Sequence, residues 1–150
     1  MQAGSCLCNF SANASAWSPP DLGGGVSSPA SGGPVDRALL EDFAAASRIL
    51  AMQGVVDAFG HVSIRHTDAP DRFLMSRGLA PALVTAEDIQ EFTLDCITCE
   101  GDTRPSFLER FIHGEIYRAR PDVNSVVHSH SPSVIPFGLV ETPMRAMFHN

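Results

Sequence analysis

The sequence predicts an α/β or α+β fold in which helices pack on a mixed β-sheet. Strand-like segments at 61–65, 72–76 and 92–95 come first, and an amphipathic helical pattern at 107–118 follows them. A β-branched run at 123–128 then resumes the strand pattern. The length of 150 residues fits one domain.

The composition is that of a soluble globular protein, with 44% hydrophobic and 18% charged residues. The formal net charge is −7 and no basic cluster is present, which argues against a nucleic-acid partner. No apolar run reaches membrane-spanning length, so no membrane partner is expected. The first residues lack the features of a secretory signal, which predicts a cytoplasmic location.

Residues 1–34 are rich in Ser, Gly, Ala and Pro, and they offer little apolar surface to offset the entropy of ordering. We therefore expect a disordered leader at 1–34 and a folded region at 35–150. The chain has four cysteines, namely Cys6, Cys8, Cys96 and Cys99. A zinc site or two disulfides are conceivable, but we expect four ordinary thiols, because the first pair lies in the predicted leader.

The first helix is predicted to follow Asp36, a suitable N-cap, and to run through Gln53. Phe43 and Leu50 lie on one apolar stripe of this helix, and Gly54 is placed as its C-terminal stop. We expect its role to be structural.

The segment after Gly60 alternates with period two, so that His61, Ser63 and Arg65 share one face of a predicted strand. Gly60 marks a place where the backbone turns tightly or approaches another group closely. The run at 72–76 is the expected second strand, and a short polar turn joins the two into a hairpin.

Ser76, Arg77 and Gly78 follow at the end of the second strand. They offer a hydroxyl, a guanidinium and backbone amides to an anionic or carbonyl group of a ligand. An ordinary polar loop is the alternative. The third strand is predicted at 92–95, after a brief turn that begins at Thr85 with a capping-box pattern.

The helix at 107–118 has apolar residues at three- and four-residue steps, including Leu108, Phe111 and Ile112. This spacing predicts that they form the buried face of the helix. The run at 123–128 is predicted to be a buried strand.

His128 and His130 are two residues apart on the predicted strand, so both imidazoles point the same way and suit a divalent metal. A His-x-His pair without a metal is the alternative. Glu109 lies in the first turn of the preceding helix, where it is either directed at the imidazoles or a solvated charge at the helix N-terminus. His113 shares the face of Glu109, and we favour a hydrogen-bonded core histidine over a ligand or a residue supporting one.

The chain contains, in order, Gly60-His61-Val62-Ser63-Ile64-Arg65, Glu109, Arg120-Pro121-Asp122-Val123 and Val126-Val127-His128-Ser129-His130. This combined pattern resembles the class II aldolase and adducin family over roughly residues 36–150. The resemblance implies a three-layer αβα fold with a mixed, largely antiparallel sheet, truncated at its C-terminus. Residues 35–150 would then be a partial domain of that kind.

By resemblance, His128 and His130 are two of three histidine ligands of a divalent metal, and Glu109 is the catalytic acid–base that also approaches the metal. The third ligand is expected beyond the chain end, because in the family it lies well beyond the His-x-His pair. His149 falls where relatives often have a pocket histidine and is not expected to be that ligand. Zinc is the expected metal, with manganese or iron as alternatives. Members of the family commonly form tetramers, which implies a homo-oligomer.

The chain departs from the sugar-phosphate aldolases of the family at three places. It has His61 where they usually have Asn, Arg77-Gly78 where they have Thr-Gly, and Phe107 and Leu108 where they have paired serines. Two apolar side chains in place of hydroxyl donors disfavour a phosphorylated substrate. The pattern is more similar to the branch that decarboxylates aromatic heterocyclic acids, in which Arg77 would pair with a substrate carboxylate.

The resemblance implies a metal-dependent carbon–carbon lyase that performs aldol cleavage or decarboxylation of a small non-phosphorylated hydroxy- or oxo-acid. The residues expected to bind this substrate are Gly60, His61, Ser76, Arg77 and Gly78. The alternatives are a non-haem iron oxygenase of aromatic oxo-acids, an adducin-like interaction module without activity, and an inactive truncated product.

Overall fold

The computed structural model describes residues 27–143 and 145. In chain order its elements are α1 (Arg37–Met52), β1 (His61–Arg65), β2 (Arg72–Ser76), β3 (Ile89–Thr93), α2 (Arg110–Ala119) and β4 (Ser125–His128). Short 3-10 turns occupy Pro81–Leu83, Ala86–Asp88 and Ile135–Gly138. The strands form one sheet in the order β3-β2-β1-β4, and each neighbouring pair is antiparallel. Among the described strands the predicted mixed sheet is thus antiparallel throughout.

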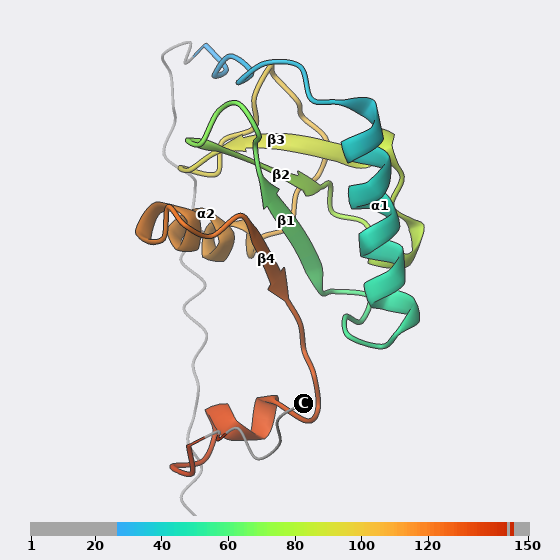
Figure 1. The fold of residues 1–150 in the computed structure, drawn as a ribbon, viewed down its shortest axis with the longest axis vertical. Coiled ribbons are helices and arrows are strands. Elements are labelled where there is room, and N and C mark those ends of the chain that lie inside the picture. The colour runs from blue at the N-terminus through green and yellow to red at the C-terminus, as the bar shows by residue number, and fades with distance from the viewer. Residues whose placement is uncertain (1–26, 144, 146–150) are drawn as a thin grey trace, which may run out of the picture.

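The sheet separates two hydrophobic cores, with α1 on one side and α2 on the other (Figure 1). Side chains alternate between the faces of β2, so Phe73 packs with Tyr117 of α2, whereas Leu74 packs with Phe43 of α1. The predicted three-layer αβα arrangement is therefore confirmed, and the side of the sheet that faces α2 is where the polar site residues gather.

The first helix has the boundaries that its capping residues predict. The Asp36 carboxylate accepts a hydrogen bond from the backbone N–H of Ala38 at 3.0 Å, which satisfies one free donor of the first turn. The helix ends at Met52, and Gly54 follows with a φ of +68°, a conformation that glycine adopts without strain. None of the described helices is long and apolar enough to cross a membrane.

The predicted hairpin of β1 and β2 is confirmed, whereas the predicted bounds of the third strand are wrong. The strand covers Ile89–Thr93 rather than 92–95, because its pairing with β2 begins where Ile89 lies opposite Ser76. A turn then ends it, in which the N–H of Cys96 donates to the carbonyl of Thr93 at 2.8 Å and Cys96 adopts a φ of +62°.

The predicted buried face of the second helix is wrong. Leu108 is 85% exposed, and Phe111 and Ile112 are also exposed, whereas the buried residues of α2 are His113, Gly114 and Tyr117. The helix begins at Arg110 instead of 107. The face of α2 that carries Gly114 is the buried one, because a residue without a side chain lets the helix lie close against the turn after β3.

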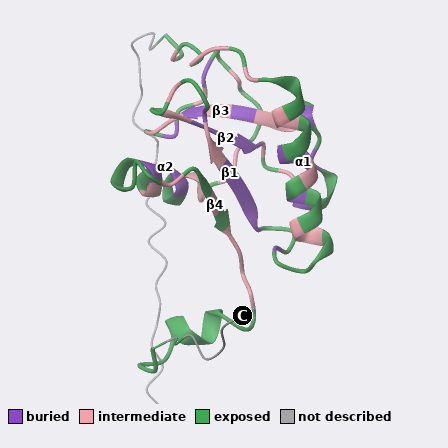
Figure 2. Cartoon of the chain, viewed as in Figure 1, coloured by how far each residue is buried: buried purple, intermediate pink, exposed green. Residues whose placement is uncertain are grey.

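The predicted buried strand at the end of the chain lies instead at the edge of the sheet. Among the described strands β4 pairs only with β1, and Val127 is 46% exposed. Figure 2 shows the contrast, with β1 largely buried and β4 largely exposed. The β-branched residues of this run therefore indicate a strand but not a central one.

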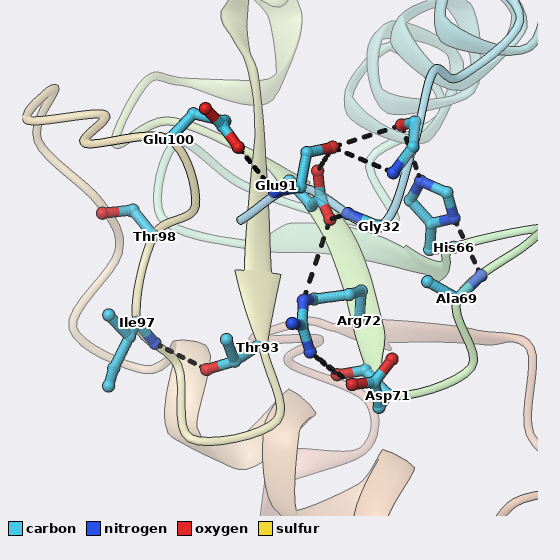
Figure 3. A network of polar contacts seen from close by, with 12 residues as sticks. Gly32, His66, Ala69, Asp71, Arg72, Glu91, Thr93, Ile97, Thr98 and Glu100 are labelled. Atoms are coloured by element: carbon cyan, nitrogen blue, oxygen red, sulfur yellow. Dashed lines mark hydrogen bonds and ion pairs between the residues drawn. The ribbon is translucent and has the colours of Figure 1, made fainter. Parts of the chain in front are cut away.

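Residues 27–34 belong to the predicted leader, yet they lie against the sheet. The hydroxyl of Ser31 and the N–H of Gly32 donate to the two carboxylate oxygens of Glu91, at 2.6 and 2.7 Å (Figure 3). The N–H of Glu100 donates to the carbonyl of Pro29 at 2.9 Å. Contacts with the rest of the chain thus begin by Ser28 rather than at 35, and residues 1–26 of the predicted leader lie outside the described residues.

Cys96 and Cys99 are buried free thiols. Burial raises the pKa of Cys99 to about 11, so this thiol stays protonated and unreactive at neutral pH. The expectation of ordinary thiols holds for this pair, whereas Cys6 and Cys8 lie outside the described residues.

Replacing Gly114 with alanine is expected to lower the free energy of unfolding by up to about 2 kcal/mol, the overpacking cost of about 1–3 kcal/mol less the roughly 1 kcal/mol by which alanine is the better helix former. A Cβ at this position would lie 2.6 Å from Cys96 Sγ and 2.7 Å from the carbonyl oxygen of Leu94, and the backbone cannot move aside as a flexible side chain would. Urea unfolding measures the change.

The matched control is Gly138→Ala, because a Cβ added there would meet nothing within 4 Å. Its unfolding midpoint should match that of the unsubstituted chain. A Gly114→Ala chain that is equally stable or more stable would contradict the close approach of α2 to this turn.

Candidate metal centre

The pairing of β1 with β4 places two histidines side by side. His61 lies directly opposite His128 in the register of the two strands, and their rings stack with centroids 4.8 Å apart. Gly60 permits the approach, because a Cβ there would lie 3.0 Å from the carbonyl oxygen of His128 and 2.7 Å from the Cβ of Val56. The close backbone approach predicted at Gly60 is confirmed.

Glu109 extends from the N-terminus of α2 toward both imidazoles. Its Oε2 lies 3.3 Å from His61 Nε2, and its Oε1 lies 3.6 Å from His128 Nε2. Each of these three residues offers a ligand atom, and the three atoms lie within 4.8 Å of one another. The carboxylate is thus directed at the imidazoles rather than away from them.

His130 joins this group through His128. The strand ends at His128, and the Nε2 atoms of the two histidines lie 3.0 Å apart with the ring planes nearly perpendicular, at 86°. His128 Nε2 thus lies near both His130 Nε2 and, at 3.6 Å, Glu109 Oε1, and imidazoles and carboxylates are donor types that suit a divalent cation.

Asp57 holds the other side of the His130 ring, and the sequence analysis did not identify it. His130 Nδ1 lies 3.2 Å from Asp57 Oδ2, while Asp57 Oδ1 accepts hydrogen bonds from the N–H groups of Phe59 and Gly60. The bond from Phe59 is the largest cause of the lowered pKa of Asp57, and His130 adds to it. A proton held on Nδ1 leaves Nε2 free to bind a metal. The signal in the sequence that could have identified Asp57 is its position three residues before Gly60.

The substitution Asp57→Asn is expected to weaken Zn²⁺ binding by about 10–100-fold, because His130 loses its anionic acceptor. The asparagine oxygen can still cap the turn, so the fold should be unaffected. Competition with a zinc-binding dye measures the affinity. Asp122→Asn is the matched control, since Asp122 pairs with Arg120 on the surface. Equal affinities in the two variants would exclude this role for Asp57.

His113 lies in the core behind His61 and is fully buried. Its Nε2 lies 2.9 Å from His61 Nδ1, and its Nδ1 lies 2.6 Å from the hydroxyl of Ser63, which in turn contacts the Tyr117 hydroxyl at 2.7 Å. Burial lowers the pKa of His113 to about 3 and raises that of Tyr117 to about 12, so both side chains are neutral at pH 7. Burial also lowers the pKa of His61.

Ser63 and Tyr117 were not identified as site residues from the sequence. Ser63 shares a strand face with His61, and Tyr117 lies four residues after His113, so both follow from periodicity once the buried face of α2 is known.

The three residues predicted to bind an anionic or carbonyl group, Ser76, Arg77 and Gly78, lie in different surroundings. Arg77 donates from Nε to Asp88 Oδ1 at 2.7 Å, and its N–H donates to the carbonyl of Asp88 at 2.8 Å. The side chain of Ser76 is buried at the end of β2. Gly78 alone of these three lines the cavity beside Glu109, and its N–H donates to the carbonyl of Pro105 at 2.7 Å.

A cavity of about 520 Å³ adjoins the histidine cluster. Phe107 connects the two, since its ring packs against that of His61 with centroids 4.5 Å apart. The described residues that line the cavity are Ala58, Phe59, Gly78, Leu79, Ala80, Pro105, Ser106, Phe107, Leu108 and Glu109. Apolar walls with one carboxylate suit an organic ring better than a phosphate group. His149 lies outside the described residues.

The family model described as the class II aldolase and adducin N-terminal domain matches residues 41–150. The decarboxylase tropJ of Talaromyces stipitatus is 38% identical over 109 residues, which cover 71% of this chain and 41% of that protein. The 3,4-dihydroxyphthalate decarboxylase of Arthrobacter keyseri is 35% identical over 114 residues, which cover 70% of this chain and 45% of that protein. The chain spans less than half the length of these two relatives.

The fold is similar to that of a solved aldolase. The L-fuculose 1-phosphate aldolase from Glaciozyma antarctica superposes with a TM-score of 0.62 at 27% identity, over 75% of this chain and 51% of that chain.

Proposed function

This chain belongs to the class II aldolase and adducin family, and from that premise we propose that it carries part of the active site of a metal-dependent carbon–carbon lyase. The observation that carries the proposal is the convergence of Glu109, His128 and His130 beside an apolar cavity. Two curated relatives are decarboxylases, which supports decarboxylation over aldol cleavage.

We propose that His128, His130 and Glu109 hold the cation, with zinc preferred over manganese or iron. Because the chain spans less than half of its curated relatives, a further ligand from outside these residues is part of the proposal. A bound divalent cation would supply a Lewis acid that stabilises negative charge on substrate oxygen atoms.

Glu109 is proposed to move the proton. As a carboxylate, Glu109 would first take the proton of the substrate hydroxyl group. When the bond between the ring and the carboxylate breaks, carbon dioxide leaves, the electron pair stays on the substrate carbon, and that carbon takes the proton from Glu109. Glu109 is the one acidic residue among the described residues that line the cavity. His61, at 3.3 Å, orients its Oε2.

The proposed substrate is a small aromatic acid that carries a hydroxyl or oxo group beside its carboxylate. Phe107 and Leu108 line the cavity, and no Lys or Arg is among the described residues that line it. A phosphate group would therefore lack a cationic partner there, whereas an aromatic ring would pack against the apolar walls.

Metal removal tests this function. The chain is stripped with a chelator, reloaded with Zn²⁺, Mn²⁺ or Fe²⁺, and assayed for carbon dioxide release from 3,4-dihydroxyphthalate, the substrate named for the Arthrobacter relative. We expect release only from the reloaded chain. Equal release from the stripped chain, or none at full metal loading, would contradict the proposal.

One observation favours a second candidate. Two histidines and one carboxylate form the ligand set of many non-haem Fe(II) oxygenases, and His128, His130 and Glu109 supply that set. Oxygen consumption by the Fe²⁺-loaded chain, without carbon dioxide release in the absence of oxygen, would identify this activity in place of the lyase.

A further inference from the structure

A row of five hydrogen-bonded side chains runs through the core to the metal centre. The links join Tyr117 to Ser63 at 2.7 Å, Ser63 to His113 at 2.6 Å, His113 to His61 at 2.9 Å and His61 to Glu109 at 3.3 Å. The first four residues have exposed fractions of 2% or less. Water is therefore excluded from the links between them, and each must be satisfied by its neighbours in the row.

The Tyr117 end of the row is a donor. Burial raises the pKa of the phenol to about 12, so it keeps its proton. The hydroxyl of Ser63 is the side-chain acceptor within reach of that proton. Left unshared, the proton would be a buried donor without a partner, which folded proteins avoid.

This donor fixes the direction of every later link, because a hydroxyl and a neutral imidazole each have a single hydrogen to donate. Ser63 accepts from Tyr117 and therefore donates to His113 Nδ1. His113 then carries its proton on Nε2 and donates to His61 Nδ1. His61 in turn carries its proton on Nε2, which faces Glu109 Oε2. The row ends on a carboxylate, which accepts hydrogen bonds only, so both ends favour the same direction.

We propose that His61 is a positioning residue that donates from Nε2–H to Glu109, and that it is excluded from the ligand set by the row of hydrogen bonds behind it. Distance alone groups His61 with Glu109 and His128 as possible ligands. A protonated nitrogen, however, has no lone pair to give to a metal. Glu109 then has one oxygen held by His61 and the other, Oε1, facing His128.

The inference rests on the proposed function for its account of the metal, but the proton on His61 is measurable without one. Long-range ¹H–¹⁵N spectra of the histidine-labelled chain, recorded without metal and with Zn²⁺, report which ring nitrogen carries the proton. The signals of His61 are assigned by their loss in His61→Gln. We expect Nε2–H in both states. A proton on Nδ1 of His61 in either state would overturn the proposal.

Titration with Co²⁺ tests whether His61 donates a hydrogen bond to Glu109 or binds the metal itself. Glutamine at position 61 keeps an N–H that can reach Glu109, so His61→Gln should still bind one Co²⁺ with an affinity within about tenfold of the original. His128→Gln is the matched control and should lose stoichiometric binding. Equal loss in the two variants would make His61 a ligand and overturn the inference. If the unsubstituted chain binds no Co²⁺, the proposed metal site is wrong. The spectrum of the metal-free chain still shows which ring nitrogen of His61 carries the proton.

Discussion

Replacing Glu109 with glutamine is expected to lower kcat for carbon dioxide release by about 10²–10⁴-fold, because the substrate carbon loses its proton donor. This loss corresponds to roughly 3–5 kcal/mol of activation free energy. Glutamine has nearly the same shape, and its amide oxygen can still accept from His61 Nε2, so the arrangement around the site should persist. The measurement is initial rates with the metal-loaded chain and 3,4-dihydroxyphthalate.

The control for this substitution is Glu115→Gln, which changes the same functional group on α2 at a position where the carboxylate pairs with Arg118 on the surface. Its kcat should match that of the unsubstituted chain. Bound zinc is quantified in each sample, so that a loss of turnover is separated from a loss of metal. A Glu109→Gln chain that holds its metal and keeps its full kcat would exclude the proton-transfer role.

Acid is expected to destabilise the metal-free chain through His113. Burial lowers the pKa of this imidazole from 6.5 to about 3, so between these values the unfolded chain binds a proton that the folded chain does not. The free energy of unfolding therefore rises with pH across this window and is lost as the pH falls through it. The full shift corresponds to roughly 4–5 kcal/mol, a large fraction of the stability of an ordinary domain.

Urea unfolding of the chelator-treated chain at several pH values between about 7 and 4 measures this dependence. His113→Gln removes the titrating group while keeping a polar side chain, so its stability should be lower at pH 7 and should vary much less with pH. The chelator removes bound metal, so that competition between protons and metal for the same side chains does not contribute to the pH dependence. The same slope in both chains would show that other groups cause the acid sensitivity.

Elements with local signals were predictable from the sequence. Asp36 and Gly54 mark the ends of α1 through capping chemistry, and the alternation after Gly60 specifies β1 without reference to the rest of the chain. The meeting of Glu109 with His128 followed from the family resemblance. Local pattern alone left a solvated charge as an alternative for Glu109.

Features that depend on distant contacts were not predictable in this way. The spacing of Leu108 and Phe111 is helical, but spacing does not determine which face meets the sheet, and Gly114 and Tyr117 occupy that face. The pairing of His61 with His128 was not predicted, because it spans more than sixty residues and no local pattern encodes it. Asp57 and Ser63 were missed for the same reason.

The position of β4 in the sheet has a consequence for the order in which the chain folds as it is made. The hairpin of β1 and β2 and the addition of β3 need only residues up to Thr93, whereas β1 acquires its second neighbour from Ser125–His128. At about 5–20 residues per second, translation from the end of β1 to the end of β4 takes roughly 3–13 s. Throughout this interval the backbone donors and acceptors along one edge of β1 have no strand beside them, and nascent chains are at their most prone to aggregate through that edge.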